Sequence, residues 1–246
     1  MSQPHTGSAD VTGVNPTQVF TYRHSTAVRI THWINVLCLL ILVMSGLQIF
    51  NATPALYWGQ QSNFAAPLYE LQFPAWATLP GYQDLATGRR WHFFFAWAFV
   101  INGLAYLVHG FATRHVQRDL IPTAAELKNI PTVIRDHARL KFPRGEEAKR
   151  YNALQQLSYV GVVFVLLPVT VLAGLTMSPG IDAAAPWLLD LFGGRQSART
   201  VHFICAFTIV AFVLVHVIMV LISGVWNNLR SMITGRYAIQ QEDLHP

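Results

Sequence analysis

The sequence predicts an all-α integral membrane protein with a four-helix transmembrane bundle, and three observations lead to this fold class. Of the 246 residues, 52% are hydrophobic and only 12% are Asp, Glu, Lys or Arg, which is about half the charged fraction of a soluble domain. Four charge-free windows are long enough to cross a bilayer. Most basic residues lie before the first window, between the second and the third, or after the fourth. This composition excludes a disordered chain, a coiled coil and an ordinary cytosolic enzyme.

Each charge-free window holds at least about 20 mainly apolar residues, the length that a helix needs to cross about 30 Å of hydrocarbon. We expect the spans at about 29–50, 91–112, 153–177 and 201–224. The first window continues beyond its span, but four prolines between residues 54 and 80 argue against another helix there. Because Tyr and Trp prefer the membrane surface, this stretch is expected to be an aromatic-rich interfacial loop.

Lys and Arg residues set the orientation, because they are enriched in cytoplasmic loops. Thirteen of the 17 precede the first span, lie between the second and third spans, or follow the fourth. The N-terminal segment 1–28, the loop 114–150 and the tail 225–246 are therefore expected in the cytoplasm, with the membrane domain at 29–224. Topology accounts for the net charge of +5, so no nucleic-acid partner is needed. The polar N-terminal residues show no signal peptide, and we expect the first span to stay as an anchor.

Five histidines lie in or at the edges of the predicted spans: His32, His92, His109, His202 and His216. Ionisable side chains at this depth are expensive and usually functional. His202 and His216 are 14 residues apart, which is about 40° short of four full turns and about 21 Å along a helix axis. Both imidazoles therefore leave the same face. Two imidazoles in this arrangement can ligate two b-type haems, one above the other.

Each haem needs a second axial ligand at its own depth. His92 begins the second span on the outer side and pairs with His202, whereas His32 begins the first span on the inner side and pairs with His216. His109 has the depth of the inner haem too, but it is about 100° around the helix from His92. It points away from the haems if His92 faces them, so we favour His32 and keep His109 as the alternative. The absence of C-x-x-C-H excludes covalent haem attachment.

The histidines occur in characteristic contexts: Arg29-Ile-Thr-His-Trp33, Arg89-Arg-Trp-His92, and the pair His202 and His216. With them the chain resembles the membrane cytochrome b subunits of bacterial nickel–iron hydrogenases and formate dehydrogenases, from about Tyr22 to Tyr237. In that family one His of the first helix, one of the second and two of the fourth ligate two haems. The resemblance implies a multi-pass protein of the bacterial inner membrane. The extra His109 and the long loop 114–150 depart from the family pattern.

Other polar residues are candidates for contacts with the cofactors. Haem propionates are anions that Arg holds well, although membrane topology explains these arginines equally. The candidates are Arg89, Arg90 and Arg199 near the outer haem and Arg29 near the inner one. An exchangeable quinone needs hydrogen-bond donors and protons, and the candidates near the inner surface are His24, His109, Asn152 and Gln155.

Two functions remain open. The first is an electron-transfer subunit that passes electrons between a periplasmic redox protein, the two haems and the membrane quinone pool. The periplasmic partner would be of molybdenum, iron–sulfur or cytochrome type, and Trp91-His-Phe-Phe-Phe-Ala-Trp97 resembles family members that serve molybdenum enzymes. The second is a self-contained membrane oxidoreductase in which a small molecule such as superoxide meets the outer haem. The long outer loop 51–88 offers a docking surface for a protein, which favours the first function. No catalytic residue is predicted.

Overall fold

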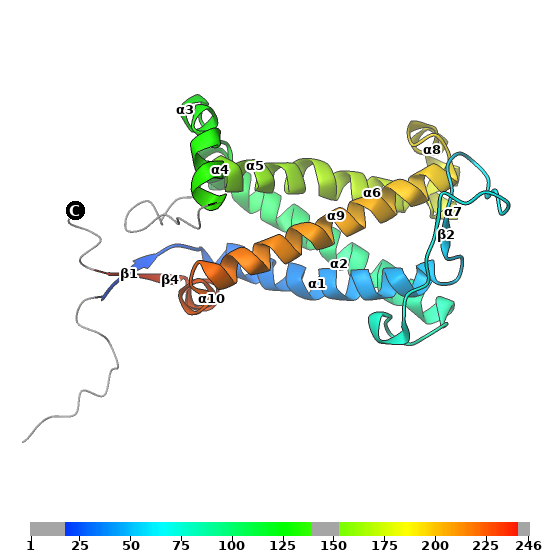
Figure 1. The fold of residues 1–246 in the computed structure, drawn as a ribbon, viewed down its shortest axis with the longest axis horizontal. Coiled ribbons are helices and arrows are strands. Elements are labelled where there is room, and N and C mark those ends of the chain that lie inside the picture. Colours follow the sequence, from blue (N-terminus) through cyan, green and yellow to red (C-terminus); the bar gives the residue numbers. More distant parts are fainter. Residues whose placement is uncertain (1–17, 139–152, 241–246) are drawn as a thin grey trace, which may run out of the picture.

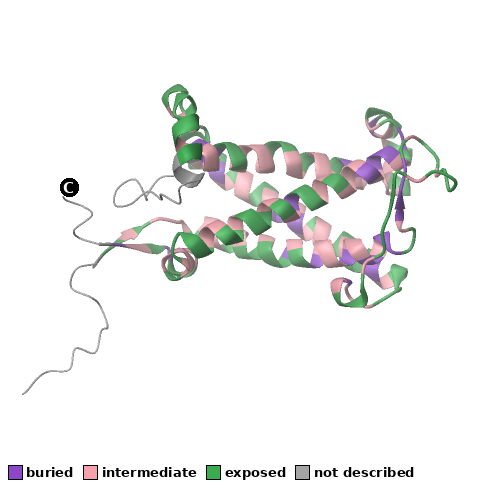
Figure 2. Ribbon diagram, in the orientation of Figure 1, coloured by how far each residue is buried: buried purple, intermediate pink, exposed green. Residues whose placement is uncertain are grey.

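Four long helical segments form the bundle in the computed structural model, which describes residues 18–138 and 153–240 (Figure 1). Within this part of the chain, four segments are long and apolar enough to cross a membrane. They are α1 (Thr26–Phe50), α2 (Leu85–Ala112), the composite segment Ala153–Leu175 and α9 (Arg195–Ile222). Their outward faces leave many large apolar side chains exposed (Figure 2), as a surface in contact with lipid requires. The prediction of four apolar helices is confirmed.

The helices begin before the apolar windows do, because polar residues cap them. The Ser25 hydroxyl accepts a hydrogen bond from the Val28 backbone N–H at 3.3 Å, so α1 begins at Thr26. The Asp84 carboxylate accepts from the Thr87 backbone N–H at 3.1 Å, so α2 begins at Leu85. Apolar windows therefore mark the hydrocarbon depth, and the capping residues mark the ends of the helices.

The third membrane segment is interrupted at its middle. It consists of α5 (Ala153–Gly161), a π-helical turn (Val162–Leu166) and α6 (Leu167–Leu175). Pro168 lies in the first turn of α6. Its ring would clash with the carbonyl of Phe164, four residues earlier, in a regular α-helix. The wider π-helical turn is one way for the helix to accommodate a proline.

The bundle consists of two helical hairpins. Helix α1 packs along α2, and α6 packs along α9. The first hairpin is joined by an aromatic-rich loop with β2 (Ala55–Leu56), β3 (Tyr69–Glu70) and a single 3-10 turn (Ala75–Ala77). The second is joined by α7 (Pro179–Ala184) and α8 (Pro186–Leu191). Both connections lie at the same end of the bundle, which we call the loop end (Figure 1).

The loop of the first hairpin is tied to α9 of the second at the loop end. Arg199 donates to the carbonyl of Ala55 at 2.8 Å and also to that of Thr53. The Thr200 hydroxyl donates to the Tyr57 carbonyl at 2.6 Å. These bonds hold the aromatic loop across the end of the bundle.

The opposite end carries both ends of the described chain, and we call it the ribbon end (Figure 1). Strand β1 (Gln18–Tyr22) pairs antiparallel with β4 (Arg236–Gln240). Shorter helices lie here too: the π-helical turn Val116–Leu120, α3 (Ala124–Lys128), α4 (Ile130–Ala138) and α10 (Val225–Thr234). Together with the loop end, they bracket the apolar length of the bundle.

Candidate functional site

Four of the five intramembrane histidines face each other in two pairs. At the loop end, the ring centroids of His92 on α2 and His202 on α9 lie 6.1 Å apart with an interplanar angle of 70°. At the ribbon end, the centroids of His32 on α1 and His216 on α9 lie 6.4 Å apart at 60°. The rings that face each other are therefore those that the sequence pairs by depth.

The separation within each pair fits one iron atom between two imidazoles. A bond from a metal to an imidazole nitrogen is about 2.0–2.1 Å, and the ring centroid lies about 1.1 Å behind the nitrogen, so two rings on opposite sides of a metal have centroids about 6.3 Å apart. The observed values of 6.1 Å and 6.4 Å lie on either side of this figure. Both pairs thus have room for an axially ligated haem iron.

Hydrogen bonds at Nδ1 orient the loop-end pair. His202 Nδ1 lies 2.8 Å from the Thr170 carbonyl oxygen, which can only accept, so Nδ1 carries the hydrogen. His92 Nδ1 lies 3.1 Å from Ser45 Oγ. Because the Ser45 hydroxyl itself donates to the Ile41 carbonyl at 2.6 Å, its oxygen accepts from His92. Both rings therefore keep an unprotonated Nε2, the form that binds a metal.

The ribbon-end pair has different surroundings. In the described part of the chain, neither ring has a hydrogen bond to a protein group, and aromatic contacts surround them instead. The His32 ring meets the edge of Trp33 at a centroid distance of 5.5 Å, and the His216 ring stacks on Phe212 at 6.3 Å. The Trp33 indole N–H donates to the Met232 carbonyl of α10 at 3.0 Å. Helix α10 thus helps to fix the surroundings of this pair.

His109 belongs to a polar cluster at the ribbon end, and its ring faces no other histidine ring in the part of the chain that the structure describes. Its Nε2 lies 3.5 Å from Ser25 Oγ, next to the start of α1. His24 is half-buried nearby, and burial together with the positive charge of Arg23 lowers its pKa to about 4. Gln155 is in the first turns of α5, whereas Asn152 lies outside the described residues. Of the predicted quinone residues, the structure thus describes three.

The arginines that are predicted to contact haem propionates differ in the hydrogen bonds that they already make within the protein. Arg199 donates to loop carbonyls, and these bonds account for its position without an anion. Arg89 and Arg90 are exposed in the first turns of α2. Arg29 donates to Thr26 Oγ1 at 2.9 Å and to the Ile233 carbonyl, but its buried Nε has no partner among the described residues. Arg29 therefore keeps a donor for an anion.

Sequence reasoning missed Ser45, Thr170 and Gln48. The Gln48 side chain is 1% exposed and packs where Gly88 of α2 leaves space, and within the described residues both its amide atoms lack a partner. An unpaired buried polar group costs about 1–3 kcal/mol, so Gln48 points to a polar group that the described residues do not supply. The sequence does contain a signal for these three residues, because each is a polar residue within a predicted apolar span.

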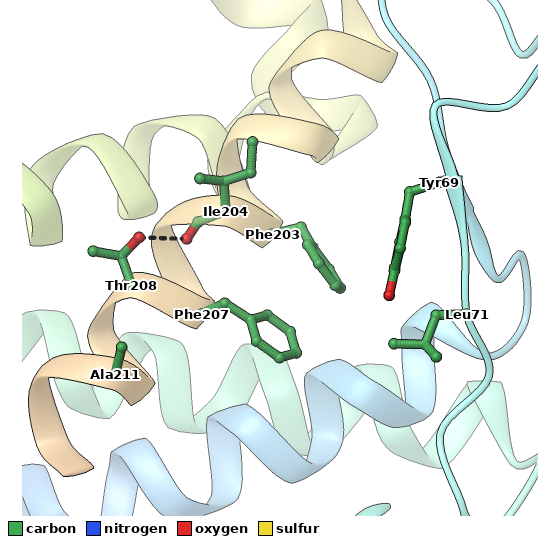
Figure 3. A pocket seen from close by; sticks show the side chains of 7 residues that line it. All are labelled: Tyr69, Leu71, Phe203, Ile204, Phe207, Thr208 and Ala211. Carbon is green, nitrogen blue, oxygen red and sulfur yellow. Dashed lines mark hydrogen bonds between the residues drawn. The ribbon is translucent and has the colours of Figure 1, made fainter.

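An open apolar groove lies between α9 and the aromatic loop near the loop end (Figure 3). Tyr69 and Leu71 face Phe203 and Phe207 across it. The Thr208 hydroxyl on its wall donates to the Ile204 carbonyl at 2.8 Å. The lining is almost entirely apolar, and the groove is at the opposite end of the bundle from the polar cluster of His24 and His109.

Comparison with known proteins identifies similar chains. The family model described as prokaryotic cytochrome b561 matches residues 23–235, a range that contains both histidine pairs. A protein of Azospira oryzae that carries the name of a protein-methionine-sulfoxide reductase subunit is 33% identical over 212 residues, covering 86% of this chain and 96% of the relative. A protein of Cupriavidus necator, named as a Ni/Fe-hydrogenase B-type cytochrome subunit, is 28% identical over 209 residues, covering 80% of this chain and 77% of the relative.

Proposed function

The chain belongs to the prokaryotic cytochrome b561 family of membrane electron-transfer proteins, which bind haem b, and on this premise we propose that it is a di-haem transmembrane cytochrome. It passes electrons between a redox protein outside the cytoplasmic membrane and the quinone pool within it. The observation that carries the proposal is the presence of two facing histidine pairs, each spaced for one iron atom and each with one member on α9. The haems, when bound, supply the one-electron chemistry.

The chain's own residues hold and orient the two haems. His92 and His202 would hold the haem at the loop end, and His32 and His216 would hold the haem at the ribbon end. Thr170 and Ser45 fix the protonated nitrogen of the loop-end ligands. The orphaned donor of Arg29 at the ribbon end supports a contact with a propionate there. At the loop end we assign the propionate contacts to Arg89, Arg90 and Gln48, with Arg199 as a further candidate.

Quinone exchange takes place at the ribbon end, which faces the cytoplasm. The distribution of Lys and Arg supports this orientation. A quinone enters from the bilayer and needs two protons and hydrogen-bonding groups for its carbonyls. His24 and His109 lie at this end, and Asn152 and Gln155 are predicted to join them. With a pKa of about 4, His24 is neutral at physiological pH and can hydrogen-bond a quinone oxygen.

The partner protein docks at the loop end. Large aromatic side chains project from its connections, among them Trp58, Trp76 and Trp187, and Trp76 is 82% exposed. Exposed aromatic residues are enriched in protein interfaces. The relatives named as subunits of a reductase and of a hydrogenase support a partner that carries the catalytic centre, of molybdenum, iron–sulfur or cytochrome type.

The haem content of the purified protein tests the proposal. A pyridine haemochrome assay on fully loaded protein is expected to give two haems b per chain, with a b-type reduced spectrum. A fully loaded preparation with one haem or none would contradict the di-haem assignment. Reduced protein should then be reoxidised by a soluble quinone analogue.

A further inference from the structure

We propose that Gly174 is a positioning residue for His202, and that Gly46 plays the same part more weakly for His92. The two glycines thereby fix the ring planes of the ligands of the loop-end haem. We call each glycine, together with the hydrogen-bond acceptor beside it, a glycine seat. This inference rests on the proposed haem ligation and adds to it the residues that set the orientation and redox potential of one haem of the two.

The seat at Gly174 is defined by close approach. A Cβ built on Gly174 of α6 would lie 3.1 Å from both Nδ1 and Cε1 of His202, which is tighter than nine in ten real Cβ contacts. The ring also donates to the Thr170 carbonyl at 2.8 Å. Thr170 is four residues before Gly174, so the two residues are neighbours on one face of α6. Glycine therefore lets the ring edge reach a carbonyl of the adjacent helix.

The seat at Gly46 repeats this arrangement on the other hairpin. A Cβ on Gly46 of α1 would lie 3.4 Å from Cε1 and 3.7 Å from Nδ1 of His92. The neighbouring residue Ser45 accepts the hydrogen bond from this ring at 3.1 Å. Because 3.4 Å borders on ordinary van der Waals contact, a methyl group is tolerated better here than at Gly174.

Each seat combines a missing Cβ with an acceptor for Nδ1–H. The missing Cβ sets the rotation of the ring, and the acceptor raises the basicity of Nε2, which stabilises the ferric iron relative to the ferrous iron. Both seats are supplied from within a hairpin: α1 holds the ligand of α2, and α6 holds the ligand of α9. The ribbon-end rings of His32 and His216 have no such hydrogen bond in the described residues. The combination of a nearby glycine and an acceptor for Nδ1–H is thus specific to the loop-end haem.

The test is Gly174→Ala in the full-length, haem-loaded protein. The methyl group should displace the His202 ring and lengthen its bond to Thr170. A tenfold fall in the preference for ferric iron, the lower end of the loss in metal affinity that follows removal of such a partner, corresponds to a rise of about 59 mV in the midpoint potential of one haem. Its low-spin EPR signal should change, because that signal depends on the angle between the imidazole planes. Gly46→Ala should act in the same direction with a smaller shift, and the other haem should keep its potential.

Matched controls separate positioning from a general effect of alanine in a membrane helix. Gly161→Ala changes the same membrane segment and Gly103→Ala changes α2, and in both cases the new Cβ meets nothing within 4 Å. Both variants should keep both potentials and both EPR signals.

A shifted potential and EPR signal for one haem in Gly174→Ala, or loss of that haem alone, with unchanged controls, supports the inference. Wild-type potentials and signals in Gly174→Ala overturn it, and so do equal shifts in Gly161→Ala and Gly103→Ala. A wild-type protein without two haems would instead refute the proposed function, before any glycine variant is measured.

Discussion

The two ends of the bundle hold their histidine pairs in contrasting ways. At the loop end, hydrogen bonds from both rings and two glycines of adjacent helices fix His92 and His202. At the ribbon end, His32 and His216 lie among aromatic rings, close to a cluster of titratable side chains. Similar ring separations thus occur in two environments, one that fixes orientation and one that offers protonatable groups.

This difference suggests a division of labour within one electron path. Electron transfer between two proteins benefits from ligands that do not reorganise, and the loop-end pair is built in that way. Quinone chemistry couples electrons to protons, and the ribbon end has the neutral His24 and the nearby His109. The contacts around the histidine rings, rather than the histidines themselves, distinguish the two proposed haem sites.

Substitution of the proposed haem ligands should have the largest effect, because it changes the haem content at one end of the bundle only. His202→Ala should lower the haem content from two per chain to one and remove the loop-end haem, whereas His216→Ala should remove the ribbon-end haem. Haemochrome assay and redox titration measure both results. His115→Ala serves as the control, because this histidine lies near Tyr106 and in neither pair. Two haems retained in either ligand variant would contradict the pairing.

A second substitution pair sharpens the assignment at the ribbon end. His32→Ala should remove one haem, and His109→Ala should leave both, because only the His32 ring faces His216. His109 is instead next to Ser25. The assignment is reversed if His109→Ala loses the haem and His32→Ala retains it.

The proposed roles of the two ends predict opposite kinetic defects. His109→Gln should slow reoxidation of the haems by quinone about 100-fold, the effect expected of a lost acid–base group, while reduction by the periplasmic partner is unchanged. Trp76→Ala and Trp58→Ala should slow reduction by the partner and spare the quinone reaction. Stopped-flow absorbance of the haems follows both steps. Slower quinone reaction in the tryptophan variants, or a quinone bound beside His92 and His202, would move the quinone site to the loop end.

The smallest expected effect is a pH dependence of stability at the ribbon end. The pKa of His24 is lowered from 6.5 to about 4 by burial and by the charges of its neighbours, Arg23, His32, His115 and Arg29. Between these values the unfolded chain binds more protons, so the stabilisation is present above pH 6.5 and is lost as the pH falls towards 4. The melting temperature of His24→Gln should fall by a few degrees less than that of the wild type over this window. Parallel curves would show that His24 does not contribute.

The sequence alone predicted the number of apolar helices, and the membrane depth that it assigns to each histidine stays a prediction. Those predictions depend on helical rise, on hydrophobic length and on basic residues, which are all local properties. Ligation by His32, His92, His202 and His216 stays a prediction, although the facing rings are those paired by depth.

Contacts between helices that are distant in sequence could not be predicted in the same way. Ser45 and Thr170 are ordinary hydroxyl residues of apolar helices, and only the packing of α1 on α2 and of α6 on α9 brings them to the rings. Arg199 was expected near a propionate, and its bonds to loop carbonyls depend on how a long loop folds back. The helix starts at Thr26 and Leu85 were missed because capping residues precede the apolar windows.

The division of the bundle into two hairpins has a consequence for biogenesis. In the proposed sites, each iron joins a ligand of the first hairpin, α1 or α2, to a ligand of α9 in the second. The hairpins can be inserted into the membrane one after the other during synthesis, and the cofactors would then add iron–ligand bonds to the hydrogen bonds and the β1–β4 pairing that already join the two halves. Haem supply then acts as a checkpoint on assembly. In haem-starved cells the chain should be inserted and yet be joined less firmly between its halves, in a form that membrane proteases can recognise and remove.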